Sequence, residues 1–253
     1  MNYTYVHSGQ RPFFNLFTLN GLEVTGVRPP DHPWHTGLSL AIAHVGAANF
    51  WGGPTFVRNR GYVQLPNNGT MRHDGFDHRT VEGFRERLTW LTEQGEHVAS
   101  EVRTVEAATD TDHWTLDFAS EIRNTTTTPL IFGSPTTNGR PDAGYGGLLW
   151  RGPASFTGGR VLGARMGEIS TWLAFVTPQA TLVFLAPAPT WWFVRSEPFA
   201  AVCPAPFFHE EVALAANAVL RLRYRLVIAD GAWDERRIRA CRPPEGGGLF
   251  SGE

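Results

Sequence analysis

Two imidazoles and a carboxylate lie within five residues in the segment Asp31-His32-Pro33-Trp34-His35. Imidazole exchanges protons near neutral pH, and it also suits Zn, Cu, Fe or Ni. Pro29, Pro30 and Pro33 forbid a helix here, so a rigid loop is predicted, which holds polar groups at low entropic cost. The segment therefore predicts an acid/base or substrate-contact site or a metal site. The structural alternative is an Asx-turn at Asp31 with two surface or core histidines.

Three further segments carry polar groups that could join this loop. His73, in the segment Arg72–His78, either lies in a surface loop or ends a short strand and points into the cleft of His35. Arg151 follows the glycines of Gly144–Gly147, which would let a backbone approach a ligand while the guanidinium holds an oxyanion or hydroxyl. His209, next to Glu210, could contribute from the far side of a cleft. The alternatives are a turn with a solvated Arg151 and an exposed loop around His209.

Aromatic residues could form the walls of such a cleft. The sequence has 9 Trp, and cleft Trp side chains commonly stack on sugar faces or aromatic ligands. We place Trp34, Trp51 and Trp191-Trp192 near the cleft, although for any single one of them the sequence favours a position in the core.

Composition excludes several classes of function. The sequence has no Lys, which rules out Schiff-base, Walker-lysine and Ser–Lys chemistry. A net charge of -2 gives no basic footprint for nucleic acid, and no long apolar run predicts a membrane span. The N-terminus lacks the pattern of a signal peptide, so a cytoplasmic location is expected. Cys203 and Cys241 lack metal-site or redox spacing, although the sequence does not decide whether they pair.

The elements that must position these residues are predicted to be strands. Apolar residues alternate with Arg from Leu220 to Leu226, and dense Gly, Pro and Asn turns separate many similar short segments. With 27 Gly, 18 Pro and 18% charged residues, a helical bundle is excluded, and only 233–240 reads as a helix. We predict an all-β protein with very little helix, a large antiparallel two-sheet β-sandwich forming one domain over 1–242. A flexible tail over 243–253 is expected to follow. The other expected strands are 13–19, 36–44, 80–91, 98–106, 114–118, 171–176 and 181–185.

The chain resembles the PmoA-like family over about residues 11–231. The resemblance is carried by Arg11-Pro12-Phe13-Phe14, by the segment Asp31–Leu38, by Asn49-Phe50-Trp51-Gly52 and by Tyr145–Leu148 followed by Arg151, with His73 at a matching position. It implies a soluble β-sandwich similar to the galactose-mutarotase-like supersandwich and a link to sugar chemistry. One departure is Trp34, which stands where many relatives have a His and so puts a metal site in doubt.

These observations favour an enzyme acting on a small sugar-like or other oxygen-rich molecule in a concave sheet face, with epimerase, lyase or hydrolase chemistry. His35 and His73 would be the acid/base pair, and Asp31 would orient a histidine. Arg151, Trp34, Trp51 and His209 would bind substrate. No cofactor is expected unless His32 and His35, with His73 or His209, hold a divalent metal. The other alternative is a non-catalytic carbohydrate-binding module. The oligomeric state is not predicted.

Overall fold

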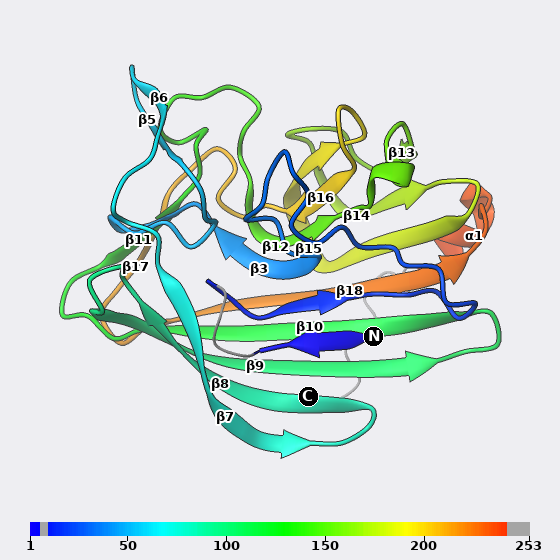
Figure 1. Ribbon diagram of the computed structural model, residues 1–253, viewed down its shortest axis with the longest axis horizontal. Helices are drawn as coiled ribbons and strands as arrows, with labels where there is room; N and C mark the ends of the chain where they lie inside the picture. Colours follow the sequence, from blue (N-terminus) through cyan, green and yellow to red (C-terminus); the bar gives the residue numbers. More distant parts are fainter. Residues whose placement is uncertain (6–9, 242–253) are drawn as a thin grey trace.

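The computed structural model describes residues 1–5 and 10–241 (Figure 1). Strands dominate it, as expected from the alternating sequence patterns. The elements are β1 (Asn2–Thr4), β2 (Phe13–Asn15), β3 (Leu38–Ile42), β4 (His44–Val45), β5 (Thr55–Val57), β6 (Gly61–Val63), β7 (Thr70–Arg79), β8 (Gly83–Leu91), β9 (His97–Thr109), β10 (His113–Asn124), β11 (Leu130–Gly133), β12 (Gly146–Arg151), the 3-10 helix η1 (Ala154–Phe156), β13 (Arg160–Leu162), β14 (Ile169–Val176), β15 (Ala180–Arg195), β16 (Ala201–Pro204), β17 (Val212–Leu214), β18 (Val219–Asp230) and α1 (Glu235–Ala240).

One antiparallel sheet folds over into two layers. Among the described residues it has 13 strands, in the order β1-β2-β3-β12-β16-β15-β18-β10-β9-β8-β7, with β14 and β13 attached to one side of β15. One layer contains β3, β12 and β16, and the other contains β18, β10, β9, β8 and β7 (Figure 1). The predicted all-β, antiparallel two-layer architecture is confirmed.

Strand β15 joins the two layers. Its first part, 180–185, pairs with β18, whereas 192–195 pairs with β16. Between the two parts lie Pro187 and Pro189, which are exposed. Proline has no N–H to give to a sheet, so it is tolerated where a strand leaves one partner for another.

The layer of β3, β12 and β16 has two buried faces, because successive side chains of a strand point to opposite sides. Leu40, Leu148 and Val202 face the main core between the layers. Their sequence neighbours Ala41, Leu149 and Cys203 face outward, into a second apolar cluster. That cluster also contains Trp51, Tyr145, Phe193 and Phe208, and it forms the floor of the candidate site.

Some sequence predictions need correction. The strand expected over 13–19 is only Phe13–Asn15, and the helix begins at Glu235 because the Asp234 side chain accepts a hydrogen bond from the Arg237 N–H at 2.8 Å. The surface loop expected around His73 is instead part of strand β7, with a β-bulge between His73 and Gly75.

The two cysteines are both free, with Cys203 buried. Within the described range no helix is long and apolar enough to cross a membrane. The predicted tail over 243–253 lies outside the described residues.

Candidate functional site

The loop that carries Asp31, His32 and His35 is closed by its own backbone. Val27 and Thr36 form a β-bridge, and the Arg28 N–H donates to the His35 carbonyl at 2.7 Å. Inside this closure the His35 N–H donates to the His32 carbonyl at 2.9 Å. The predicted rigid loop is therefore present.

The loop is attached to the end of β12. The Gly26 N–H donates to the Arg151 carbonyl at 2.8 Å, and the Arg151 N–H donates to the Gly37 carbonyl at 2.9 Å. Gly37 has φ 50° and a Cβ there would lie 2.2 Å from the Phe14 carbonyl oxygen, so the position requires glycine. These contacts bring Arg151 beside the loop, although the two are more than a hundred residues apart in sequence.

The side chain of Arg151 contacts both Asp31 and His35. Its Nη2 donates to the two carboxylate oxygens of Asp31 at 3.1 and 2.9 Å, and its Nη1 donates to Nδ1 of His35 at 3.1 Å. The guanidinium lies 3.9 Å from the centre of the Phe199 ring, and the residue is only 5% exposed. Arg151 thus holds Asp31 and His35 in place, and it is not solvated as the structural alternative supposed.

Asp31 is ionised and paired with His32. The Nδ1 atom of His32 lies 2.7 Å from Oδ2 of Asp31. Partial burial raises the pKa of Asp31, but the hydrogen bonds from His32 and Arg151 and the charge of Arg151 outweigh it and lower the pKa to about 2. A carboxylate that accepts from Nδ1–H fixes the tautomer of a neutral imidazole and leaves Nε2 free to take a proton.

His35 is buried and neutral. Burial, followed by the positive charges of Arg151, of Arg11 and of His32 when that ring is protonated, lowers its pKa to about 2. Because Nδ1 accepts from Arg151, the proton of the neutral ring is on Nε2. This corrects the role expected of His35: a ring that stays neutral at physiological pH serves as a hydrogen-bond donor rather than as a proton shuttle.

The two imidazoles stack on each other. Their ring centroids lie 4.6 Å apart with an interplanar angle of 17°. The Nδ1 atom of each ring contacts the Asp31–Arg151 ion pair, so the Nε2 atom of each ring points away from that ion pair. Because both residues line the same pocket, the base of one and the donor of the other are available to one bound molecule.

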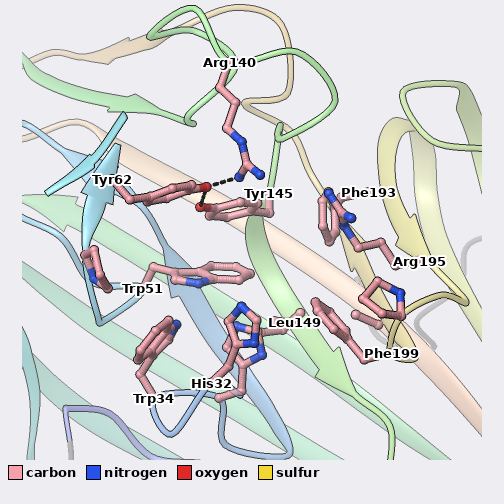
Figure 2. Close-up of a pocket in the computed structure, with 14 residues that line it drawn as sticks. His32, Trp34, Trp51, Tyr62, Arg140, Tyr145, Leu149, Phe193, Arg195 and Phe199 are labelled. Atoms are coloured by element: carbon pink, nitrogen blue, oxygen red, sulfur yellow. Dashed lines mark hydrogen bonds between the residues drawn. The ribbon is translucent and has the colours of Figure 1, made fainter. Parts of the chain in front are cut away.

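The pocket has a volume of about 340 Å³ (Figure 2), which is within the range of small-molecule sites. Figure 2 shows His32 at one end, Trp51 and Tyr145 in the middle, and Arg140 at the other end. Its aromatic walls are Trp34, Trp51, Tyr62, Tyr145, Phe193 and Phe199. Trp34 and Trp51 therefore lie in the cleft, as placed from the sequence.

Trp51 is positioned by the side chain of Asn49. The Asn49 Oδ1 accepts from the N–H groups of Trp51 at 2.8 Å and Gly52 at 3.0 Å, and Nδ2 donates to Oγ1 of Thr55 at 3.0 Å. The Trp51 ring then stacks obliquely on Tyr145 with centroids 4.1 Å apart. The Asn-Phe-Trp-Gly segment thus builds one wall of the pocket.

Four residues expected at the cleft do not line it, namely His73, His209, Trp191 and Trp192. His73 lies in β7, with Nδ1 2.5 Å from Oε1 of the buried Glu86, so the expectation that it shares the cleft of His35 is wrong. His209 packs on Trp191 and Phe208 with ring centroids at 4.5 Å and does not line the pocket. Trp192 is fully buried in the main core.

The proposed metal ligands are therefore not assembled as expected. His73 and His209, the two candidates for a third ligand, lie away from His32 and His35. Among the described residues there is no group of three or more His, Cys, Asp or Glu side chains arranged to hold an ion. Nδ1 of each loop imidazole is already engaged, one by Asp31 and the other by the cationic Arg151.

Sequence reasoning missed most of the pocket. Tyr62, Arg140, Phe193, Arg195 and Phe199 line it, yet none stands in a motif. They come from the β5–β6 hairpin, the loop before β12 and the two ends of the β15–β16 connection. Tyr145 had a signal, because it lies within the glycine-rich segment before Arg151.

Comparison with known proteins places the chain in a family without assigning it an activity. A family model matches residues 1–241. The chain belongs to DUF6807, a family of unknown function. No curated protein matches this DUF6807 member.

A search of solved structures finds an alpha-galactosidase from Lactobacillus brevis with 8% sequence identity and a TM-score of 0.39. The match covers 91% of this chain and 38% of that one. The DUF6807 chain thus spans well under half of that enzyme. The PmoA-like resemblance is not tested by these matches and stays a prediction.

Proposed function

We propose that this protein is an enzyme that moves a proton on a small, hydroxyl-rich molecule, such as a sugar or sugar derivative, bound against the aromatic walls of the pocket. The observation that carries the proposal is the Asp31–His32 pair, whose imidazole lines the pocket while its carboxylate is held by Arg151. This proposal also extends the PmoA-like resemblance, whose Asp-His-Pro loop supplies these residues.

His32 would be the general base. Asp31 accepts from Nδ1, so the lone pair of Nε2 takes a proton from a carbon beside a carbonyl or from the hydroxyl of a hemiacetal. His35 would donate its Nε2–H to the substrate oxygen on which negative charge develops. A neutral imidazole is suited to this, because it polarises a carbonyl without first giving up a proton.

The protonated His32 would then complete the reaction. If the planar intermediate turns its other face to His32, return of the proton to the same carbon gives an epimer. Departure of a neighbouring hydroxyl with that proton, as water, gives a lyase product. In both outcomes the proton that His32 takes from the substrate is given up again, so the neutral imidazole is regenerated. In this scheme His35 donates a hydrogen bond and takes no part in the proton transfer.

The test is proton exchange in heavy water. Protein is incubated with a panel of neutral and acidic monosaccharides in D2O. Loss of the signals of carbon-bound protons beside the carbonyl, and the rate at which the two anomers interconvert, are followed by NMR. We expect a substrate to exchange, and His32→Gln to lower the rate by about 100-fold or more. The matched control is His97→Gln, because His97 is exposed, its Nε2 pairs with Oγ of Ser100 at 3.0 Å and it does not line the pocket.

Two results would contradict this proposal. A folded His32→Gln protein that exchanges protons at the wild-type rate would remove the base. Sugar binding that depends on Trp34 and Trp51, without exchange of any proton, would indicate the carbohydrate-binding module instead.

A further inference from the structure

The pocket has an unbalanced charge. Its lining includes Arg140 and Arg195 but no Asp or Glu. The nearest carboxylate described above, Asp31, is already engaged by Arg151 and His32. Within the described residues, neither lining arginine forms an ion pair with a carboxylate.

Arg140 is held at the far end of the pocket by aromatic groups. Its Nη1 donates to the hydroxyl of Tyr62, and its guanidinium lies 4.7 Å from the centre of that ring. The Tyr62 hydroxyl also shares a hydrogen bond of 2.7 Å with Tyr145 (Figure 2). A guanidinium has five donors, so this arrangement orients Arg140 and leaves donors for a ligand.

Arg195 approaches the pocket from a different strand. It ends β15, and its guanidinium lies 5.5 Å from the centre of the Phe193 ring. Figure 2 places it beside Phe193 and near Phe199, on the side away from Tyr62. The two arginines therefore line the pocket from separate elements, Arg140 at one end and Arg195 at the side.

A third arginine adds to the positive field from behind the wall. Arg11 is 6% exposed and donates to the carbonyls of Trp51 at 2.7 Å and Trp34 at 2.8 Å and to Oγ of Ser39 at 3.1 Å. None of these acceptors carries a charge. Burial without an acidic partner lowers the pKa of Arg11 to about 10, so it is still a cation at neutral pH.

We infer that the substrate of this pocket is an anion, a small hydroxyl-rich molecule whose carboxylate or phosphate is bound by Arg140 at the end of the pocket opposite His32, while Arg195 adds positive charge from the side wall beside Phe193. The inference rests on the proposed function for its reaction, but the charge argument concerns binding alone. A bound anion would supply the counter-charge that the pocket lacks, and guanidinium groups match both oxyanions in geometry. It would also place the hydroxyl-bearing part of the ligand between the anionic end and His32.

The experiment measures binding of matched probes by calorimetry or ligand-observed NMR. D-glucuronate and D-glucose 6-phosphate are compared with D-glucose and with inorganic phosphate. We expect at least one acidic sugar to bind about tenfold or more tightly than D-glucose. Tighter binding of D-glucuronate identifies a carboxylate substrate, and tighter binding of D-glucose 6-phosphate identifies a phosphate ester.

Variants then locate the anion site. Arg140→Gln and Arg195→Gln are each expected to reduce binding of the preferred acidic sugar about tenfold and to leave D-glucose unchanged. Arg160→Gln is the control, because it removes the same charge from an exposed strand outside the pocket. If no acidic probe binds more tightly than D-glucose, or if both pocket variants bind it like wild type, the inference is overturned.

Failure of this inference and failure of the proposed function are distinguishable. The same titrations are repeated with His32→Gln, which is expected to keep the preference for acidic sugars. Acidic preference without proton exchange leaves the anion site standing and removes the enzyme. Proton exchange on neutral sugars, without tighter binding of acidic sugars, supports the enzyme and removes the anion site.

Discussion

The burial of His35 predicts an unusual dependence of stability on pH. The folded protein disfavours the imidazolium form, because the ring is 3% exposed, is surrounded by cations and accepts a hydrogen bond from Arg151. Its pKa is about 2 in the folded state against 6.5 for an ordinary histidine. Below pH 6.5 the unfolded chain therefore binds a proton that the folded protein does not bind, and stability falls as pH falls.

The loss of stability can be calculated from the pH range between the two pKa values of His35, about 2 in the folded protein and 6.5 in the unfolded chain. Each pH unit below 6.5 costs about 1.4 kcal/mol, so lowering the pH from 7.5 to 4.5 removes about 3 kcal/mol through His35 alone. Carboxylates with lowered pKa, such as Asp31, lose their contribution only as pH falls from their ordinary value of 3.8 downward. Most of the decrease in the free energy of unfolding above pH 4.5 therefore comes from histidine. This decrease is a large fraction of the total stability of an ordinary domain.

The perturbation that isolates this contribution is His35→Asn. The amide oxygen can replace Nδ1 as the acceptor for Arg151, and the side chain does not titrate. We expect urea unfolding curves to show that the free-energy difference between wild type and variant shifts by about 3 kcal/mol in favour of the variant between pH 7.5 and 4.5. His44, whose pKa is also lowered by burial, is present in both proteins and cancels.

A control and a refuting result complete the design. His97→Asn removes an exposed histidine and is expected to follow the wild-type pH dependence. If the free energies of wild type and His35→Asn change in parallel with pH, then His35 does titrate normally in the folded protein. The assignment of its ring as a permanent donor would then be wrong.

Three further perturbations test the charges around the site and in the core. Arg151→Met is expected to destabilise the protein by about 1–3 kcal/mol in urea unfolding and to raise the pKa of Asp31 toward 3.8, since both depend on the guanidinium; unchanged stability would refute this. Glu101→Leu is expected to cost about 3–5 kcal/mol, because it strips the fully buried Arg103 of its carboxylate partner; a cost below about 1 kcal/mol would count against it. Elemental analysis is expected to find less than about 0.1 metal ion per chain, since no third ligand joins His32 and His35 among the described residues and Arg151 engages both Asp31 and Nδ1 of His35; a stoichiometric metal would restore the metal-site alternative.

The sequence predicted the long strands because their burial alternates. Strand β10 is buried at every second residue along most of its length, and β18 pairs with it over 11 residues in a register that keeps apolar side chains on one face. Strand β15 was predicted only over 181–185, since two prolines follow. The sheet accepts them because the strand changes partners there, which is a property of the whole fold.

The site could be predicted only where it is local in sequence. Asp31, His32 and His35 lie within one proline-rich loop, so their proximity is visible in the sequence. Arg151 also lies at the site, but its role depends on contacts with the loop that only the folded sheet creates. His73 was misplaced because its partner Glu86 comes from the next strand, and a cross-strand pair of this kind leaves no local pattern.

Burial and the charge of Arg151 together give the two loop imidazoles proposed roles that differ from the expected ones. The guanidinium of Arg151 stabilises the ionised form of Asp31 and thereby the carboxylate that orients His32, while the same positive charge opposes protonation of His35. Two stacked imidazoles would otherwise compete for one proton. Burial of His35, strengthened by the charge of Arg151, would in the proposed mechanism separate them into a base that Asp31 orients and a donor that stays neutral.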